Sequence, residues 1–514
     1  MNRKKYVSRS IIWGILDKII AIALPFITRT VLIYTMGELF LGLNGLFTSI
    51  MSVLSLSELG VCSAIVFSMY QPIAKGKDDE VCALLNFYKK CYRVIGFVVL
   101  TLGLLLMPFL GKLISGDIPA NINLNYLYII NLLNTVISYE LFAYKSSLLI
   151  AVQRNDIVSK ISSVGQILQC TIKIFSLVIL QNYYLFIATS ILGTIFNNVF
   201  SAVICKRYYP QYICKGNISE KQLKQIAQKI KGMIFQKIGG VILTSLDTIV
   251  ISAFLGLVAL GRYQNYYFIS NSVHTVLIVI MQSMISSIGN SVAIESVQKN
   301  YNDFRRFNGI YVFIVIWCTT CLVCLYQPFM ELWVGKEMMF SNAIMIFCAI
   351  AFFAHNWCDM LYVYQEACGI WWETRFVPLF ASLVNFLINI ITVNYMGIIG
   401  ILFGTIISFF LVYNLGYARV LFSTYFKGYN TVHGYIRKQL KYLAVGVMIC
   451  SVTYVVCSII NIETLIVQLI VRMLLCVVIP ALFVCIFKNY DKDLKSGLDL
   501  ILGIVCSKFR KVDR

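Results

Sequence analysis

Three residues that are costly in hydrocarbon lie within one apolar stretch near the start of the chain. The segment LDKIIAIALPFITRTVLIYTMG covers residues 16–37 and contains Lys18, Pro25 and Arg29. On a helix that turns about 100° per residue these positions share one stripe, with the two cations about 16 Å apart along the axis. Because proline frees a backbone carbonyl and a charge within the membrane needs a partner, we expect this stripe to face a hydrated cavity.

Cations in such a cavity have the chemistry to bind phosphate. Arginine can bind phosphate oxygens through two parallel hydrogen bonds, and lysine supplies a compact positive charge. Lys173 lies in the middle of QILQCTIKIFSLVIL, too deep to reach the headgroups easily. We therefore assign Arg29, Lys173 and Lys18 to a phosphate-binding site. The alternative for Lys18 and Arg29 is that they extend to the headgroups at the two membrane surfaces.

A second polar group lies in later apolar segments and has the chemistry of a coupling-cation site. Its members are Asp247, Asn385, Asn389 and Thr405. Their carboxylate, amide and hydroxyl oxygens are hard ligands suited to sodium or to a proton relay. Asn385 and Asn389 are four residues apart and so share one helix face. Hydrogen bonding between helices, common for Asn and Thr in membrane bundles, is an equal alternative.

Three other charged residues are gate candidates. Glu58 lies in LSLSELG, and Glu366 and Arg375 lie in or beside EACGIWWETRF, all near the ends of apolar segments. The alternative is that they are solvated helix ends.

The cysteines do not predict a metal site or a catalytic centre. There are seventeen of them, most inside apolar segments, where free cysteine behaves as a small hydrophobe. The densest group, Cys318, Cys321 and Cys324, would fan around a helix rather than converge. We expect no metal and no bound cofactor.

The elements that must position these residues are membrane-spanning helices. Hydrophobic residues make up 59% of the 514 positions and charged residues 13%, against roughly 25% charged in a soluble domain. With about 20 apolar residues needed per span, fourteen spans are predicted. They lie near 11–34, 41–70, 84–112, 122–144, 157–180, 183–205, 234–256, 263–292, 307–330, 341–365, 376–396, 398–421, 441–460 and 464–487.

The basic residues are distributed unevenly between the connections. Lysine and arginine outnumber aspartate and glutamate by 43 to 23, a formal net charge of +20. They concentrate before the first span and in alternate loops, the positive-inside pattern, which predicts that both termini are cytoplasmic. The excess also attracts anionic membrane lipids, and we expect no nucleic-acid binding. The first apolar segment has no small-residue cleavage site, so we expect it to be retained.

An internal repeat relates the two halves of the chain. Without gaps, KIIAIALPFITRTVLIYTMGELFLG (18–42) aligns with KIGGVILTSLDTIVISAFLGLVALG (237–261), and lysine and glycine positions coincide. An even number of spans per unit gives both halves the same orientation, a parallel pseudo-two-fold arrangement typical of transporters. We predict an all-α polytopic membrane protein with two six-helix lobes and an appended helix pair.

This repeat divides the chain into four parts. We predict an N-terminal lobe (1–205), a cytoplasmic linker (206–233) with an amphipathic helix, a C-terminal lobe (234–425), and spans 13 and 14 with a basic tail (426–514). In the linker, a capping box is expected to begin the helix at Ser219.

Two segments carry a family resemblance. They are YTMGELFLGLNGLFTSIMSVLSLSELGVCSAIVFSMYQPIA (34–74) and QEACGIWWETRFVPLFASLVNFLINIITVNYMGIIGI (365–401). The chain resembles the multidrug/oligosaccharidyl-lipid/polysaccharide (MOP) flippase superfamily, most closely its capsule and O-antigen (Wzx-type) branch. The resemblance implies two lobes around a central cavity that moves an undecaprenyl-pyrophosphate-linked oligosaccharide from the inner to the outer leaflet of a bacterial plasma membrane. It makes the pyrophosphate of this substrate the expected ligand of Arg29, Lys173 and Lys18. It also supports a cation site in the second lobe.

The sequence can be compared with two classes of function, a transporter and an enzyme. A flippase would use alternating access, driven by sodium, protons or the membrane potential, and would supply polysaccharide polymerase machinery. A multidrug exporter or a lipid II flippase is the alternative within that class, and basic residues in the first lobe favour an anionic substrate over cationic drugs. An enzyme of the same pathway is disfavoured, because no acid, base or nucleophile motif recurs at catalytic spacing.

Overall fold

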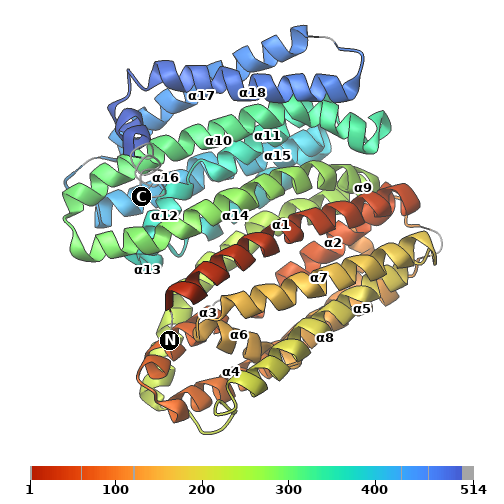
Figure 1. The fold of residues 1–514 in the computed structure, drawn as a ribbon. Coiled ribbons are helices and arrows are strands. Elements are labelled where there is room, and N and C mark those ends of the chain that lie inside the picture. The colour runs from red at the N-terminus through yellow and green to blue at the C-terminus, as the bar shows by residue number, and fades with distance from the viewer. Residues whose placement is uncertain (1–2, 59–60, 120–121, 430, 461, 501–514) are drawn as a thin grey trace. The chain divides into compact units, whose positions relative to one another are not determined.

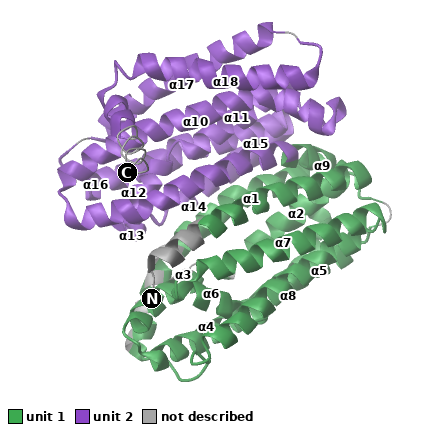
Figure 2. Ribbon diagram, viewed as in Figure 1, with its two compact units in different colours: residues 1–264 green, residues 265–514 purple. Residues whose placement is uncertain are grey.

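The computed structural model describes residues 3–58, 61–119, 122–429, 431–460 and 462–500, and every regular element in these ranges is a helix (Figure 1). The chain divides into two compact units, residues 1–264 and 265–514 (Figure 2). The boundary falls inside one long helix. The predicted division into lobes at 205 and 234 rests on the repeat and stays a prediction.

The described part of unit 1 contains eight complete α-helices, two short 3-10 segments and the first part of a ninth α-helix that crosses the boundary. They are α1 (Arg3–Met36), α2 (Glu38–Leu54), η1 (Ser55–Glu58), α3 (Val61–Ala74), α4 (Asp78–Leu106), η2 (Met107–Leu113), α5 (Leu124–Glu140), α6 (Ala143–Ala151), α7 (Asn155–Val178), α8 (Tyr183–Tyr208) and α9 (Glu220–Ile294). The two short 3-10 segments are η1 and η2, and the helix that crosses the boundary is α9.

Unit 2 takes the rest of α9 and the remaining elements. They are α10 (Val297–Val334), η3 (Lys336–Met338), α11 (Asn342–Asn356), α12 (Asp359–Cys368), α13 (Trp371–Thr374), α14 (Val377–Met396), α15 (Ile398–Ile407), the π-helix η4 (Ser408–Tyr413), α16 (Asn414–Thr424), α17 (Val432–Ile459) and α18 (Leu465–Phe487). The predicted spans 13 and 14 are α17 and α18.

All fourteen predicted spans fall on described helices, but fewer of these helices qualify as membrane spans by length and composition. Eleven helical segments are long and apolar enough to cross a membrane, or twelve if the bent pair α5–α6 counts as one span. One of the eleven segments, residues 234–294, has 61 residues, which is long enough to contain the two spans predicted there. The predicted span at 41–70 is divided between the shorter helices α2 and α3 by the 3-10 turn Ser55–Glu58.

Glycine breaks the helices at equivalent positions of the repeat. Gly37, between α1 and α2, has φ 90° and ψ −177°, and Gly256, inside α9, has φ 85° and ψ 175°. Residues with a side chain rarely adopt positive φ, so glycine is required at both turns. The repeat aligns Gly37 with Gly256, and the matching backbone supports that alignment.

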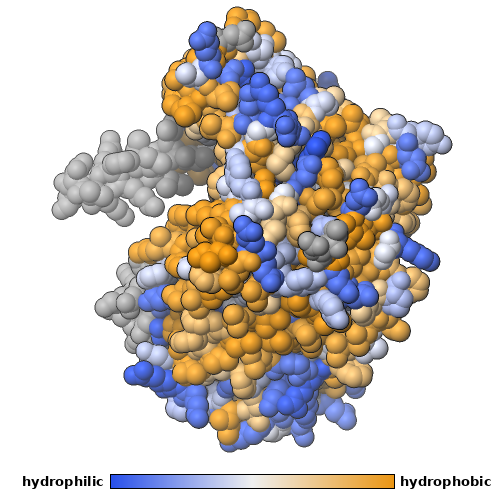
Figure 3. Space-filling model, turned by 90° about the vertical axis from the view of Figure 1, so that its right-hand side faces the viewer, coloured by the Kyte–Doolittle hydropathy of each residue, from blue (hydrophilic) through white to orange (hydrophobic). Residues whose placement is uncertain are grey.

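Long helices pack side by side in each unit. In unit 1, α1 packs along α7, and α7 packs along α8 (Figure 1). In unit 2, α10 packs against α11, α17 and α18, and α14 packs against α15. Many large apolar side chains remain exposed, among them Phe97, Leu105, Ile391 and Leu474, and hydrophobic residues cover much of the face in Figure 3. Such a surface suits lipid rather than water; the chain is a multi-pass membrane protein.

The linker prediction is confirmed at its capping box. The Ser219 hydroxyl accepts from the Gln222 backbone N–H, and the Gln222 amide oxygen accepts from the Ser219 backbone N–H, both at 3.3 Å. The helix that begins here does not stop before the membrane but continues into the next span as α9.

Candidate functional site

A cavity of about 810 Å³ lies within unit 1. It is lined by α2, η1, α3, α5, α7, α8 and the first part of α9. Most of the lining side chains are uncharged and polar, and they include Asn44, Thr48, Ser52, Asn131, Asn134, Thr135 and Ser190. A volume of this size suits a small-molecule or headgroup ligand.

Two lysines reach this cavity from different helices. Lys173 extends from α7 and Lys237 from α9. The Lys173 ammonium lies 5.1 Å from the centre of the Phe186 ring, a cation–π contact that holds the side chain without neutralising it. No carboxylate in the described part of the chain forms an ion pair with either lysine. The pair therefore gives the cavity a positive region.

Lys237 was missed as a site candidate, although the sequence contained a signal for it. The repeat aligns Lys237 with Lys18, which was assigned to the anion site. The structure instead places Lys18 on an exposed surface of α1 and Lys237 in the cavity wall.

The stripe on α1 does not line this cavity. Lys18 and Pro25 are exposed and Arg29 is partly buried. Of the three predicted phosphate ligands, only Lys173 lies in the cavity wall. The roles predicted for Arg29 and Lys18 remain predictions. Asp17, beside the stripe, faces α7, where its carboxylate accepts from Ser163 at 3.2 Å and Gln166 at 3.3 Å.

Glu58 belongs to the cavity wall. Its carboxylate accepts a hydrogen bond from the Tyr92 hydroxyl at 2.6 Å, and Tyr92 accepts one from Tyr88 at 2.8 Å. Tyr88 also contacts the Ser147 hydroxyl at 3.1 Å. This chain of hydroxyls fixes the one lining carboxylate against α4 and α6. Its role as a gate stays a prediction.

Hydrogen bonds also orient the polar wall. Thr194 donates to the Asn134 amide oxygen at 2.8 Å, and Asn131 donates to the Leu127 carbonyl at 2.9 Å. Thr48 donates to the Asn44 carbonyl at 2.7 Å. Held in this way, amide and hydroxyl groups can donate to and accept from the hydroxyls of a sugar.

Three of the four predicted coupling-cation residues meet in unit 2. Asn385 donates to the Thr405 hydroxyl at 3.1 Å, and Asn389 donates to the Asn385 amide oxygen at 3.1 Å. Both asparagines are fully buried between α14 and α15. Asp247 is also buried, but on α9 in unit 1. The structure thus shows the helix-to-helix hydrogen bonds given as the alternative, while the cation role stays a prediction.

The remaining gate candidates lie around α12 and α13. Glu366 is on α12 and partly buried. Arg375 donates to the Trp372 carbonyl, and its guanidinium lies 3.8 Å from the centre of the Trp372 ring. The arginine is therefore held by aromatic stacking at the end of α13.

A close junction joins α2 to α9 inside unit 1. Arg262 binds the Glu38 carboxylate through two hydrogen bonds, at 2.9 and 3.2 Å. A Cβ atom on Gly42 would collide with the Leu257 carbonyl, and one on Gly261 would collide with the Glu38 carbonyl. The repeat aligns Gly42 with Gly261 and Glu38 with Leu257. The two collisions are therefore one contact made twice, as expected where repeats meet across a local two-fold.

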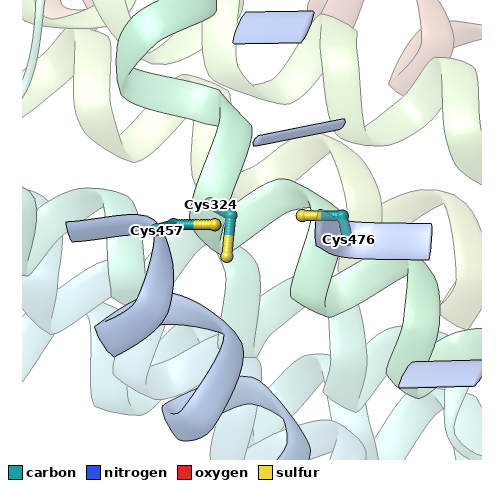
Figure 4. A group of neighbouring side chains, drawn as sticks. All are labelled: Cys324, Cys457 and Cys476. Carbon is teal, nitrogen blue, oxygen red and sulfur yellow. The ribbon is translucent and has the colours of Figure 1, made fainter. Parts of the chain in front are cut away.

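Thiols are the metal-ligand candidates among the described residues. Cys324, which the sequence placed in a group that would not converge, meets Cys457 and Cys476 from two other helices (Figure 4). Convergence thus comes from three helices rather than from one motif.

Comparison with known families decides the class of protein. The profile of the polysaccharide biosynthesis protein family matches residues 7–288, more than half of the chain. The chain belongs to this family. The fold, compared below, is that of solved transporters of the MOP superfamily, which agrees with the expectation of a transporter rather than an enzyme. No curated protein matches the sequence significantly.

Solved structures share the fold of this family member. The lipid II flippase MurJ in an inward-closed conformation is similar with a TM-score of 0.67 and 16% identity, over 93% of this chain and 98% of that one. An inward-facing multidrug resistance MATE transporter of the MOP superfamily gives 0.62 and 13%, over 78% and 94%. A MOP transporter from Pyrococcus furiosus, described as having a binding pocket of reverse polarity, gives 0.57 and 12%, over 82% and 96%. The predicted fold class is confirmed.

Proposed function

We propose that this transporter is a flippase for undecaprenyl-pyrophosphate-linked oligosaccharide repeat units in capsule or O-antigen assembly. The observation that carries the proposal is the pair Lys173 and Lys237 in a polar cavity, without ion-pair partners among the described residues. It would act in a bacterial plasma membrane with both termini cytoplasmic, and its product would go to the polymerase machinery.

The two lysines suit a diphosphate in a poorly hydrated site. Opposite charges 4 Å apart attract by about 4 kcal/mol at an effective dielectric constant of 20. Two ammonium groups can therefore replace part of the hydration that a diphosphate loses on leaving the headgroup region. In this proposal Arg29 and Lys18 meet the substrate outside the cavity wall described above.

The uncharged wall suits the glycan. Asn134 and Thr135, with their neighbours, offer amide and hydroxyl groups already oriented by hydrogen bonds. Such groups bind sugars of many kinds, so the wall is compatible with a repeat unit whose identity it does not specify.

The junction between α2 and α9 supports alternating access. Glu38 and Arg262 are at loops predicted to be extracytoplasmic, where their ion pair would close the outer side of the cavity. When this side opens, the contacts of Gly42 and Gly261 would break at the same time. The membrane potential would assist, because moving one charge through 100 mV is worth about 2.3 kcal/mol. Coupling to sodium or protons through Asp247, Asn385, Asn389 and Thr405 remains part of the proposal.

A lipid II flippase is the second candidate, and the extensive similarity of fold to MurJ favours it. Lipid II is also a polyprenyl-diphosphate sugar, so the same lysines would serve. A multidrug exporter is disfavoured, since two lysines would repel a cationic drug.

Complementation tests the proposal. A strain lacking its capsule or O-antigen flippase receives the wild type, the Lys173→Gln/Lys237→Gln double variant, or the control double variant Lys160→Gln/Lys231→Gln. The controls alter the same two helices outside the cavity lining. We expect surface glycan with the wild type and the control but not with the cavity variant, at equal membrane expression. Rescue by the cavity variant would contradict the proposed site. Rescue only of a MurJ-depleted strain would favour the lipid II candidate.

A further inference from the structure

Three cysteine thiols meet in the interior of unit 2. Cys324 on α10, Cys457 on α17 and Cys476 on α18 are each 1% exposed. Their Sγ atoms all lie within 4.8 Å of one another, and Figure 4 shows the side chains pointing toward a common centre. In the sequence, α10 is distant from the consecutive helices α17 and α18, and all three residues are free thiols.

The spacing is close to that of metal ligands. Sulfur atoms about 2.3 Å from one ion in trigonal geometry are about 4 Å apart. Thiols within 4.8 Å therefore need to approach by less than about 1 Å, which side-chain rotation can supply. The helix positions are held by a further contact, because the Trp317 indole on α10 donates to the Cys476 carbonyl at 2.7 Å.

A guanidinium lies beside the thiols. Arg472 is one turn before Cys476 on α18, and it donates to the Cys324 carbonyl at 3.4 Å. The buried Nε of Arg472 has no hydrogen-bond partner among the described residues. No carboxylate among them forms an ion pair with this arginine. A cation in a membrane bundle is stabilised by a nearby negative charge. Thiolates created by metal binding would supply one.

The donor set favours one class of ion. Thiolates select soft metals such as Cu(I) and Zn(II), but structural zinc almost always takes four ligands. Here three sulfur atoms lie within 4.8 Å of one another. The partly buried Cys321 on α10 packs against this group and contacts Cys476 without belonging to the set of three, so a trigonal ion fits the geometry better than a four-coordinate one. We propose that Cys324, Cys457 and Cys476 form a Cu(I) site that ties the α17–α18 pair to α10.

Charge balance is consistent with this assignment. The three thiols lose their protons to solvent when they bind Cu(I) as thiolates. The complex then carries two negative charges, and the adjacent Arg472 guanidinium offsets one of them. The copper stays Cu(I) throughout, so no oxidant or reductant is consumed.

Competition with a chelator tests the site. The full-length protein, purified in detergent under anaerobic and reducing conditions, is titrated with Cu(I) bound to bicinchoninate, and copper transfer is read by absorbance. We expect about one more copper ion per chain in the wild type than in Cys476→Ser. The matched control is Cys485→Ser, an exposed cysteine on the same helix, which should bind as the wild type does. Arg472→Gln should weaken binding about tenfold, the usual effect of losing an outer partner.

Two results would overturn the proposal. One is equal copper uptake by the wild type and Cys476→Ser, since copper would then sit at other cysteines. The other is retention of Zn(II) with no uptake of Cu(I), which would contradict the choice of ion. Size-exclusion profiles monitor folding, and Cys457→Ala, which removes a thiol from another helix, provides a second variant. X-ray absorption of the loaded wild type should show sulfur as the only copper ligand.

Discussion

Uncharged polar residues lie inside both units, yet they are used differently. In unit 1, Asn131, Asn134 and Thr135 line an open cavity together with two lysines. In unit 2, Asn385, Asn389 and Thr405 bond to one another between packed helices. Residue type alone therefore does not distinguish a ligand site from a helix contact. Two other features distinguish them: the residues of unit 1 line a cavity, and that cavity holds lysines without ion-pair partners among the described residues.

The largest expected effect is in the cavity of unit 1. Replacing both Lys173 and Lys237 with glutamine removes the positive charge while keeping the side chains polar. We expect glycan export to fall by more than tenfold, the equivalent of about 1.4 kcal/mol. Export is measured as surface glycan per unit of membrane-inserted protein. Unchanged export would mean that the two lysines have only a structural role, as the polar cluster of unit 2 has in this comparison.

The next effect concerns the junction that closes unit 1. Glu38→Arg places two cations together at α2 and α9, and we expect export to be impaired several-fold. Combining it with Arg262→Glu restores opposite charges and should recover most of the export. Cysteine-accessibility labelling in the cavity reports which side is open. If the double variant does not recover export, the ion pair between Glu38 and Arg262 is not needed for transport.

A smaller effect is expected in the polar cluster of unit 2. Asn385→Leu removes the hydrogen bond to Thr405 between α14 and α15, and such bonds are worth about 0.6 kcal/mol on average in membrane bundles. If the cluster is only a helix contact, the thermal midpoint falls slightly and sodium or pH dependence of transport is unchanged. Loss of that dependence would support a coupling-cation site that includes Asp247. The polar residues of both units would then bind ligands.

The smallest effect is expected at Lys18. It is exposed on α1 and does not line the cavity, so Lys18→Gln should change export by less than about twofold. Dose-dependent complementation from an inducible promoter can resolve this. A defect as large as that of Lys173→Gln would show that Lys18 contributes as much to substrate binding as a lysine of the cavity wall.

Sequence patterns predicted the helices well because each span is a local property. Fourteen apolar segments, the repeat and the capping box at Ser219 all depend on neighbouring residues or on one alignment. The predicted spans 234–256 and 263–292 lie on the two sides of Gly256, where the backbone of α9 departs from helical geometry.

The site was less predictable because several helices build it. Periodicity showed that Lys18 and Arg29 share a stripe, but not which element covers that stripe. Lys237 could have been found by applying the repeat to Lys18, although the two aligned lysines lie in different surroundings. The three cysteines converge from positions up to 152 residues apart, which helical spacing within one motif cannot reveal.

Binding of undecaprenyl diphosphate to the purified transporter tests the central claim most directly. Native mass spectrometry of the wild type, Lys173→Gln/Lys237→Gln and Lys160→Gln/Lys231→Gln in the same detergent would compare affinity for this lipid with that for undecaprenol. We predict that the wild type and the control prefer the diphosphate at least tenfold, and that the cavity variant loses this preference. Equal preference in all three proteins would contradict an anion site formed by the two cavity lysines.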